Sequence, residues 1–443
     1  MLINYSVTNW RSIKKTVDFS MIATREKQHG ERLSHVKKFN LKLLPTAAIY
    51  GGNASGKSNL VESISFAQNF ILFLRAPDAS TATRPYRLDN ESESLPTKFA
   101  FSILIDELIY DYSFAVNQSE VISEELTVIN SSSSTILFSR QGQNFDLSPS
   151  LTTADQDTQF ISYISKGTLK NVLFLTQAAY QGVNKLKPVW NWFRNCLHVL
   201  SPESQFASRH QLTAENKILG SACSHYLQAL DTGIDHLERK EVDLSNILDK
   251  DDTRKFAEFL KDGQSITLPG RRSRERYVIA KENGGIKAYR LFAAHKTSSN
   301  EFKLFEFDDE SDGTIRLIDI IPAIYDITQK ESKSVFIIDE LDRSLHTNLT
   351  RALIKSFLYH CDTNNRAQLI FTTHDVQLMD QDLFRRDELW ITERRVGESD
   401  LYSFAEYKEV RKDKQLRKTY IQGRLGGVPY IPQIPNGRIY EEI

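Results

Sequence analysis

An eight-residue run near the N-terminus has the spacing of a phosphate-binding loop. Residues 51–58 read GGNASGKS, a full match to the pattern G-x-x-x-x-G-K-[ST]. In such a loop, backbone N–H groups surround phosphates, the lysine ammonium reaches the β and γ oxygens of ATP, and the serine hydroxyl binds Mg²⁺. The pattern therefore predicts a site for ATP and Mg²⁺, with Ser58 as a metal ligand. The cofactor-binding residues expected here are Gly51, Asn53, Ala54, Ser55, Gly56, Lys57, Ser58 and Asn59.

A pair of carboxylates follows an apolar run later in the chain. Residues 335–338 read VFII and lead directly into Asp339 and Glu340. A carboxylate at the end of a central strand can enter the Mg²⁺ shell, and its neighbour can act as general base toward an attacking water. We therefore expect Asp339 to bind the metal and Glu340 to be catalytic. The alternative is a core strand that ends in two solvated acids.

A histidine follows a third apolar run. Residues 368–373 read QLIFTT and precede His374. The tip of a parallel strand faces the ligand crevice of an α/β sheet, so an imidazole there can sense or hold the γ-phosphate. We expect His374 to be catalytic, against the alternative of a structural histidine.

The stretch Ser311-Asp312-Gly313-Thr314 separates an acidic segment from an apolar helical pattern. Ser311 or Asp312 can cap the helix. A capped core helix does not account for Gly313, because glycine weakens a helix start unless something must approach the backbone closely. A helix N-terminus with a bare backbone also suits an anion, so Ser311 and Gly313 are candidate cofactor-binding residues. The expected buried face is Ile315, Leu317, Ile318, Ile321 and Ile324.

These groups need strands and helices to position them. Residues 46–50 form a short apolar run typical of a strand buried on both faces, and apolar residues then recur at helical spacing from Leu60 to Leu74. The phosphate loop would thus connect a strand to a helix. Residues 99–105 and 108–116 alternate around Asp106-Glu107 and predict a hairpin of an antiparallel lobe.

Composition narrows the class of protein. The 443 residues are 26% charged and 40% hydrophobic, which is typical of a globular protein rather than a disordered one. With 56 basic and 57 acidic residues, no overall field attracts nucleic acid or anionic lipid. The three cysteines, Cys196, Cys223 and Cys361, lie too far apart for a zinc or redox motif and indicate thiols in a reducing cytosol. No apolar stretch reaches about 20 residues, so we expect a cytoplasmic protein with no membrane partner.

The order of these features resembles the ATP-binding-cassette plan in its SMC- and RecF-like branch. The shared order is phosphate loop, long insertion, Ser-Asp-Gly-Thr helix start, acidic strand, residues 341–346 (LDRSLH), and a strand ending in histidine. The resemblance implies an α/β fold: a P-loop ABC-type ATPase head with an antiparallel β lobe and an inserted helical lobe. It also implies that residues 311–314 bind the γ-phosphate of ATP held by another subunit. Asp342 resembles part of the dimer-contact loop and is a further candidate cofactor-binding residue, and residues 9–12 (NWRS) resemble the first hairpin of RecF-type heads. Position 312 is aspartate where the family usually has glycine, and Gln68 is misplaced for the family's glutamine loop.

This resemblance divides the chain into three parts. Residues 1–146 would form the N-terminal half of the ATPase head, with the hairpin, phosphate loop and antiparallel lobe. Residues 147–274 would form a helical insertion, because helical periodicity dominates residues 159–262. Residues 275–443 would form the C-terminal half of the head, ending in a basic segment that includes Arg411, Lys412, Lys414, Arg417 and Lys418.

Longer matches resemble the AAA-family ATPases of bacterial abortive-infection and anti-phage operons, including the ATPase subunits of the Rlo, AbiL and PARIS systems. The matching residues are 50–59, 310–314, 339–342 and 420–426. The resemblance implies an ATP hydrolase that works as a homodimer, or a higher oligomer of dimers, beside a separately encoded nuclease or toxin effector. It would act as a switch or sensor. The alternative is a RecF/SMC-like ATPase that binds DNA in repair.

Two further segments carry charged residues. Residues 270–276 (GRRSRER) read as a solvated turn, with contact to nucleic acid or phosphate as the alternative. Asp380-Gln381-Asp382 has the D-x-D form of a nuclease site but lacks an apolar strand of its own, so a nuclease is disfavoured.

Overall fold

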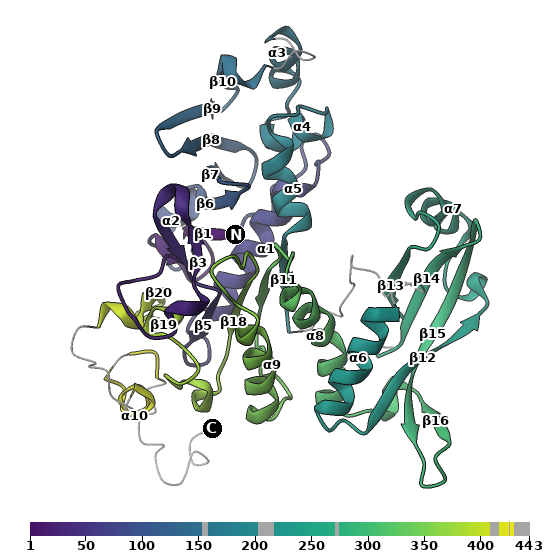
Figure 1. The fold of residues 1–443 in the computed structure, drawn as a ribbon. Helices are drawn as coiled ribbons and strands as arrows, with labels where there is room; N and C mark the ends of the chain where they lie inside the picture. Colours follow the sequence, from purple (N-terminus) through teal and green to yellow (C-terminus); the bar gives the residue numbers. More distant parts are fainter. Residues whose placement is uncertain (153–157, 203–216, 271–273, 408–415, 425, 429–443) are drawn as a thin grey trace, which may run out of the picture. The chain divides into compact units, whose positions relative to one another are not determined.

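The computed structural model describes residues 1–152, 158–202, 217–270, 274–407, 416–424 and 426–428 (Figure 1). The chain forms two compact units, and each unit contains both strands and helices. Unit 1 comprises Met1–Leu2, His29–Thr46 and Asn191–Phe371; unit 2 comprises Ile3–Gln28, Ala47–Trp190 and Thr372–Ile443. The fold is therefore mixed α/β, as the sequence predicts.

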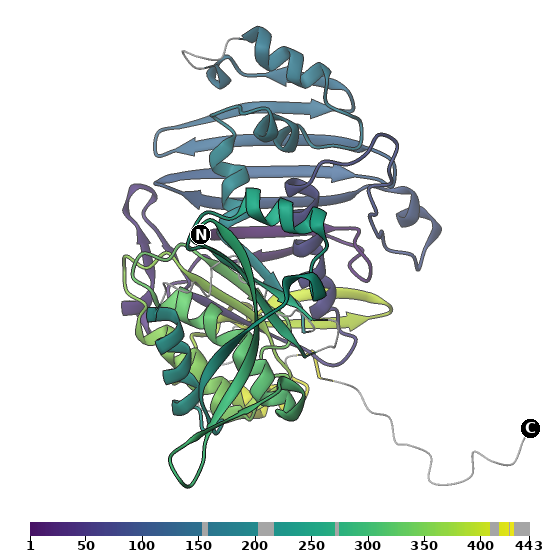
Figure 2. The same cartoon turned by 90° about the vertical axis from the view of Figure 1, so that its right-hand side faces the viewer.

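Unit 2 contains a seven-stranded sheet with the order β10-β9-β8-β7-β6-β1-β2. The predicted hairpin is confirmed: β6 (Thr97–Ile105) pairs antiparallel with β7 (Leu108–Val116). Asp106 and Glu107 both have positive φ in the turn, which matches the twist of the flanking strands. The long strands of this sheet, drawn in blue, run side by side in Figure 2. The remaining strands are β1 (Leu2–Thr8), β2 (Val17–Ser20), β8 (Val121–Asn130), β9 (Ser133–Gln141) and β10 (Asn144–Leu147).

Helix α1 (Lys57–Leu72) packs against this sheet through aromatic side chains. The ring centroids of Phe66 and Phe99 are 5.5 Å apart, and those of Phe70 and Phe114 are 5.8 Å apart. Trp10 lies 4.8 Å from Phe66. Each such pair stabilises packing by about 0.5–1.5 kcal/mol beyond simple burial. These contacts fix the position of the helix that follows the phosphate loop against the sheet.

Unit 2 also contains a second group of strands around the phosphate loop. β5 (Thr46–Tyr50) pairs parallel with β19 (Leu389–Arg395), which pairs antiparallel with β20 (Glu398–Ser403). All five residues of β5 are buried, as expected for a strand covered on both faces. The other helices of unit 2 are α2 (Asn90–Ser94), α3 (Thr158–Lys166), α4 (Phe174–Tyr180) and α10 (Leu416–Ile421); α5 (Lys187–Asn195) spans the boundary with unit 1.

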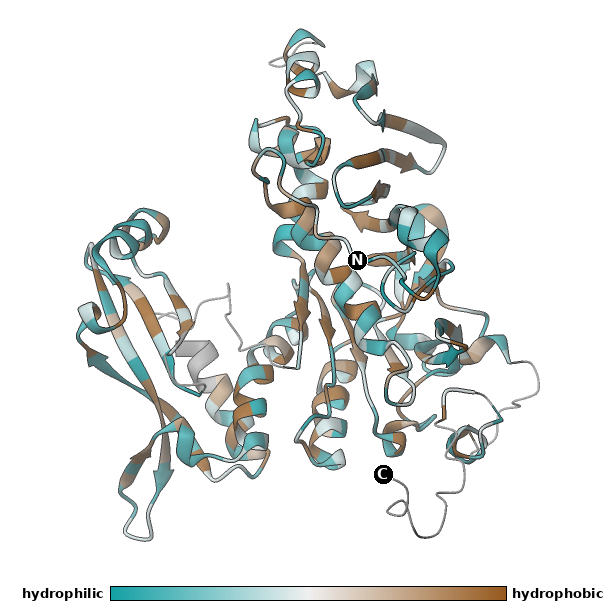
Figure 3. Cartoon of the chain, turned by 180° about the vertical axis from the view of Figure 1, so that it is seen from behind, coloured by the Kyte–Doolittle hydropathy of each residue, from teal (hydrophilic) through white to brown (hydrophobic). Residues whose placement is uncertain are grey.

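Unit 1 is built on parallel strands and on a five-stranded antiparallel sheet. β17 (Val335–Ile338) lies between β11 (Leu197–Leu200) and β18 (Gln368–Thr372), parallel to both. Figure 3 shows apolar and polar bands alternating along the strands of the five-stranded sheet. That sheet consists of β12 (Ile234–Val242), β13 (Ser265–Pro269), β14 (Arg276–Glu282), β15 (Gly285–Lys296) and β16 (Phe302–Phe305). The remaining elements are β3 (Ser34–Val36), β4 (Leu41–Leu43), α6 (Lys217–Ala229), α7 (Lys250–Phe259), α8 (Asp312–Thr328) and α9 (Thr347–Tyr359).

The segment predicted as a helical insertion is only partly helical. Residues 147–274 include helices α3 to α7, but Leu197–Leu200 form β11, parallel to β17, rather than extending the preceding helix. Residues 234–242 form β12, where eight residues pair with β15. Short apolar runs fit either period, and pairing with a distant strand decides between them. The three-part division of the chain remains a prediction.

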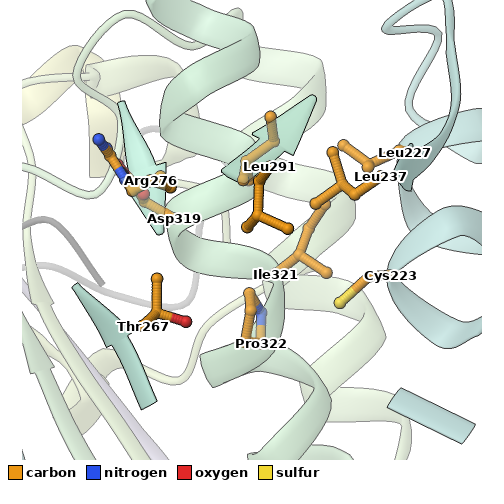
Figure 4. A pocket seen from close by; sticks show the side chains of 10 residues that line it. Cys223, Leu227, Leu237, Thr267, Arg276, Leu291, Asp319, Ile321 and Pro322 are labelled. Atoms are coloured by element: carbon orange, nitrogen blue, oxygen red, sulfur yellow. Dashed lines mark hydrogen bonds and ion pairs between the residues drawn. The ribbon is translucent and has the colours of Figure 1, made fainter. Parts of the chain in front are cut away.

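A small cavity lies within unit 1 between α6, the five-stranded sheet and α8 (Figure 4). Its volume of about 30 Å³ is enough for a few waters at most. Its walls are mainly apolar, and Arg276 forms an ion pair with Asp319 at 3.3 Å on its lining. The cavity is far too small to hold a nucleotide, so it is not a candidate ATP site.

Candidate functional site

The phosphate loop connects β5 to α1 within unit 2, as predicted. Gly56 is the residue before the helix and has a φ of 113°, which favours glycine. A Cβ at Gly51 would lie 2.3 Å from Thr392 Oγ1, and one at Gly56 would lie 2.5 Å from Ser399 Oγ. Both glycines are therefore required by close neighbours as well as by the loop. Asn53, Ala54 and Ser58 are exposed, so they are accessible to a ligand.

Lys57 is directed back over its own loop. Its side chain is only 5% exposed, and Nζ donates to the carbonyls of Gly51 at 2.8 Å and Gly52 at 3.1 Å. Nζ also lies 3.4 Å from Nδ1 of His374. Because an ammonium group only donates, Nδ1 accepts and the ring proton lies on Nε2. The loop lysine and the strand-end histidine, 317 residues apart, are thus brought together.

The hydroxyl groups of Thr392, on β19, and Ser55, in the phosphate loop, fix the conformation of the loop. Thr392 Oγ1 donates to the carbonyl of Tyr50 at 3.2 Å and lies 2.6 Å from Ser55 Oγ. The Ser55 side chain therefore serves the loop's own structure, and its backbone N–H does the same by donating to the carbonyl of Gly52 at 3.2 Å. The sequence offered no local signal for Thr392, since it is 337 residues from Ser55.

The side chain of Asn59 contacts the N-terminal hairpin. Its amide nitrogen donates to Ser12 Oγ at 2.6 Å, and its backbone carbonyl accepts from Trp10 Nε1 at 3.0 Å. Arg11 pairs with Glu62 at 2.6 Å on the same helix. Within unit 2, residues 9–12 thus hold the first turn of α1, and this is the role that the geometry gives to Asn59.

The acidic pair ends β17 in unit 1, as predicted. Asp339 is 3% exposed, and its N–H donates to the carbonyl of Leu200 at 2.8 Å. Glu340 is partly exposed and has a φ of 49°, so the chain turns sharply at this residue. The turn presents one carboxylate inside the unit and the other at its surface.

A buried arginine on α8 supports this turn. Arg316 Nη2 donates to the carbonyls of Asp339 and Glu340, each at 3.2 Å. Burial lowers the pKa of Arg316, although nearby carboxylates, of which Asp319 contributes most, act in the opposite direction. The role of Arg316 was not predicted, because its only local signal was a charge within an apolar helical pattern.

The Ser311–Thr314 turn begins α8 and confirms the predicted cap. Ser311 Oγ accepts from the N–H of Thr314 at 3.1 Å. Four of the five residues expected on the buried face are buried, and Ile318 lies partly exposed on the cavity lining.

Gly313 has a packing role within its own chain. A Cβ at this position would lie 2.7 Å from the carbonyl oxygen of Ser344, which belongs to the loop that contains Asp342. The sequence predicted that some group lies close to the Gly313 backbone. The Ser344 carbonyl is one such group. Asp342 is partly buried. In the sequence it lies between Glu340 and Ser344.

Asp312, the departure from the usual turn, is balanced by an arginine. Arg274 donates one bond to the carbonyl of Glu310 at 2.7 Å and another to the carboxylate of Asp312. Two arginines of the 270–276 run are thus engaged inside unit 1, Arg274 here and Arg276 with Asp319. Arg271 and Arg272, like Arg411, Lys412 and Lys414, lie outside the described residues.

The described residues suit ATP and Mg²⁺ by their chemistry. A buried ammonium beside bare loop backbone fits a polyphosphate, and an exposed serine hydroxyl at the helix start fits Mg²⁺, which takes few protein ligands when it binds through phosphates. Within the described ranges, no three His, Cys, Asp or Glu side chains cluster as a metal site. In the same ranges, no helix is both long and apolar enough to cross a bilayer.

Comparisons with known proteins place the chain in a family. Two solved structures match its fold weakly. The first is an SMC head bound to the C-terminal winged-helix domain of ScpA, with 12% identity and a TM-score of 0.40; the match covers 91% of this chain and 97% of that one. The second is the SMC head domain from Thermotoga maritima, with 10% identity and a TM-score of 0.34; the match covers 91% of this chain and 98% of that one. No curated protein matches. A family model described as "AAA domain, putative AbiEii toxin, Type IV TA system" matches residues 47–380, which include the phosphate loop, the acidic strand and His374. The chain belongs to this AAA-domain family.

Proposed function

We propose that this protein is an ABC-type ATPase that binds ATP and Mg²⁺ and hydrolyses ATP. The observation that carries the proposal is the position of Lys57, a buried ammonium held between phosphate-loop carbonyls and His374. Burial of a lysine ammonium costs free energy unless the charge is paired. The loop carbonyls that accept from Lys57 are neutral and therefore weaker partners than charged phosphate oxygens. A phosphate can replace them without moving the backbone.

Each residue then has a defined role. Lys57 offsets charge on the β and γ oxygens and the loop N–H groups orient them. Ser58 and Asp339 would hold Mg²⁺, which would neutralise phosphate charge. Glu340 accepts a proton from the attacking water, and His374 donates toward the γ-phosphate from Nε2.

Lys57→Ala tests the nucleotide assignment. We expect loss of ATP turnover by at least about 100-fold, because the main counter-ion of the phosphates is removed. Phosphate release by purified protein with Mg²⁺ measures it. The matched control is Lys170→Ala, which removes an exposed lysine paired with Asp78 in the same unit and should leave turnover unchanged. Equal hydrolysis by wild type and Lys57→Ala would remove the basis of the proposal.

We further propose that two copies share each ATP, with the Ser311–Thr314 turn of one copy facing nucleotide on the other. Gly313 is a poor place to test this, because its neighbour Ser344 lies in the same chain. Ser311 is better. Ser311→Asp keeps a capping oxygen but adds a negative charge next to a γ-phosphate, whereas Ser311→Asn keeps the cap and adds none.

Mixing separates a shared site from a local cap. Ser311→Asp and Lys57→Ala proteins should each be inactive alone. In freely exchanging equal mixtures half of the dimers are mixed and each has one intact site, so about a quarter of wild-type activity should return. Ser311→Asn should remain active by itself. No recovery, with subunit exchange verified, would contradict the shared site.

We also propose a role in anti-phage defence, as a switch beside a separately encoded nuclease or toxin effector similar to the Rlo, AbiL and PARIS systems. The family description, which names a type IV toxin–antitoxin system, supports this proposal. Phage challenge of cells carrying the gene with its neighbours, as wild type or Lys57→Ala, tests it. Protection by wild type alone is expected. ATP-dependent DNA binding by the isolated protein, without protection, would favour the repair alternative.

A further inference from the structure

The C-terminal segment contacts the start of the phosphate loop. The N–H of Gly52, the second loop residue, donates to the carbonyl of Gly427 at 2.7 Å. The hydroxyl of Tyr420, on α10, donates to the same carbonyl at 3.1 Å. One carbonyl thus joins the loop to a helix more than 360 residues away in the sequence, all within unit 2.

Tyr420 also packs under the strand that leads into the loop. Its side chain is 5% exposed, and its ring centroid lies 6.2 Å from that of Tyr50, the last residue of β5. Burial raises the pKa of Tyr420 to about 12, so the hydroxyl keeps its proton and remains a donor at neutral pH. The ring therefore contacts the end of the strand, and the hydroxyl binds the Gly427 carbonyl that accepts from the loop.

Gly427 is packed so closely that only glycine fits. A Cβ there would lie 2.2 Å from Ile391 Cγ2 and 3.3 Å from the carbonyl of Thr392, and its φ is 72°. Thr392 is the residue that holds Tyr50 and Ser55 from the other side. A shift of Gly427 would thus disturb both supports of the loop at once.

We infer that Tyr420 and Gly427 are positioning residues that hold the phosphate loop in the shape that binds nucleotide. The inference rests on the proposed ATP site and assigns it a support outside the phosphate-loop motif. Gly427 contacts the loop directly and Tyr420 acts through Gly427 and Tyr50, so both set the affinity for nucleotide. They have no part in bond breaking, so turnover at saturating ATP is preserved.

Paired glycine variants test this. Gly427→Ala and Gly423→Ala both place a side chain at a φ near +73°, but a Cβ at Gly423 meets nothing within 4 Å. Both variants share the backbone strain, and only Gly427→Ala pushes on β19. We expect Gly427→Ala to bind a fluorescent ADP analogue at least about tenfold more weakly than Gly423→Ala, with kcat per folded protein at saturating ATP within about twofold.

A hydroxyl deletion provides a milder test. Tyr420→Phe should weaken the binding of the analogue roughly three- to tenfold, the worth of one hydrogen bond. The control, Tyr112→Phe, removes a buried hydroxyl bonded to Glu124 at 2.9 Å in the sheet of the same unit and should leave affinity unchanged. Melting temperature, measured without nucleotide, reports the structural cost of each variant.

The outcomes separate the inference from the function beneath it. Wild-type protein that fails to bind the analogue would overturn the ATP site itself. Wild-type binding with equal affinities in Gly427→Ala and Gly423→Ala, or in the two tyrosine variants, would overturn the positioning role alone. A kcat that falls in parallel with stability while affinity is constant would also overturn it.

Discussion

The phosphate loop and the acidic strand are held by opposite kinds of chemistry. The neighbours that contact the loop from outside it are neutral: the Thr392 hydroxyl and the Gly427 carbonyl form hydrogen bonds with it, and the Ser399 side chain packs against Gly56. Guanidinium groups hold the acidic half: Arg316 binds the carbonyls of the Asp339–Glu340 turn, and Arg274 pairs with Asp312. The difference in neighbours follows from the groups present: the phosphate loop carries Lys57 and N–H donors, whereas the acidic half carries carboxylates.

A loop that receives a polyanion already carries Lys57 and rows of N–H donors, so neutral neighbours suffice to fix its shape. Carboxylates gathered at a strand end and a helix start repel one another, and the buried Arg316 and the partly exposed Arg274 offset this repulsion. The acidic half should therefore depend strongly on single arginines, whereas the loop should depend on several weak contacts.

Arg316→Met should give the larger effect on stability. The variant keeps much of the side-chain volume but leaves two carbonyls of the strand-end turn without this donor. We expect a loss of about 1–3 kcal/mol in the free energy of unfolding, seen as a lower melting temperature. Arg254→Met on α7 is the matched control, because Arg254 is 80% exposed and pairs with Glu258 only at 4.0 Å. Equal shifts in the two variants would show that the acidic half does not rely on its buried arginine.

Thr392→Val should give a smaller effect, and on affinity more than on stability. Valine has the same shape but removes the hydroxyl that joins Ser55 to the Tyr50 carbonyl. We expect roughly three- to tenfold weaker binding of ATP in equilibrium titrations, since one hydrogen-bonding group is lost. Thr392→Ser retains the hydroxyl and should bind like wild type. Weak binding by the serine variant as well would point to packing of the methyl group instead.

The smallest effect concerns a partly exposed charge pair in unit 2. A hydrogen bond from the Ser92 N–H and the nearby Lys14 ammonium lower the pKa of Asp89 from 3.8 to about 2. Because the folded-state pKa is depressed, this carboxylate stabilises the protein at pH values above 3.8, and the contribution is lost as pH falls toward 2. Asp89→Asn keeps the cap on α2 without titrating, so its melting temperature should fall less steeply over that window. Parallel pH curves for the two proteins would remove this assignment.

The sequence was sufficient where a local structure depends on neighbouring residues. The loop between β5 and α1, the Ser311 cap and the β6–β7 hairpin were all predicted, because each is specified by residues within a few positions. The strand at Leu197–Leu200 was missed because four apolar residues fit a helix as well as a strand until β17 is known to lie beside them.

The supports of the site could not be predicted, for a similar reason. Thr392 and Gly427 lie more than 300 residues from the loop that they contact, and a threonine or glycine in isolation signals nothing. Gly313 was correctly singled out as a position of close approach, but sequence alone could not identify the Ser344 carbonyl as the neighbour. Only the fold supplies such pairings.

The proposed function requires that Lys57 and Glu340 act on the same ATP, one to bind it and the other to hydrolyse it. The most direct measurement is the amount of ATP retained after gel filtration with Mg²⁺ by Glu340→Gln and by the double variant Lys57→Ala, Glu340→Gln. Glutamine keeps the shape of Glu340 but cannot act as general base, so the single variant should retain unhydrolysed ATP while turnover falls by roughly 10²–10⁴-fold. The double variant should retain none. Wild-type turnover in Glu340→Gln, or equal retention by both variants, would contradict the claim.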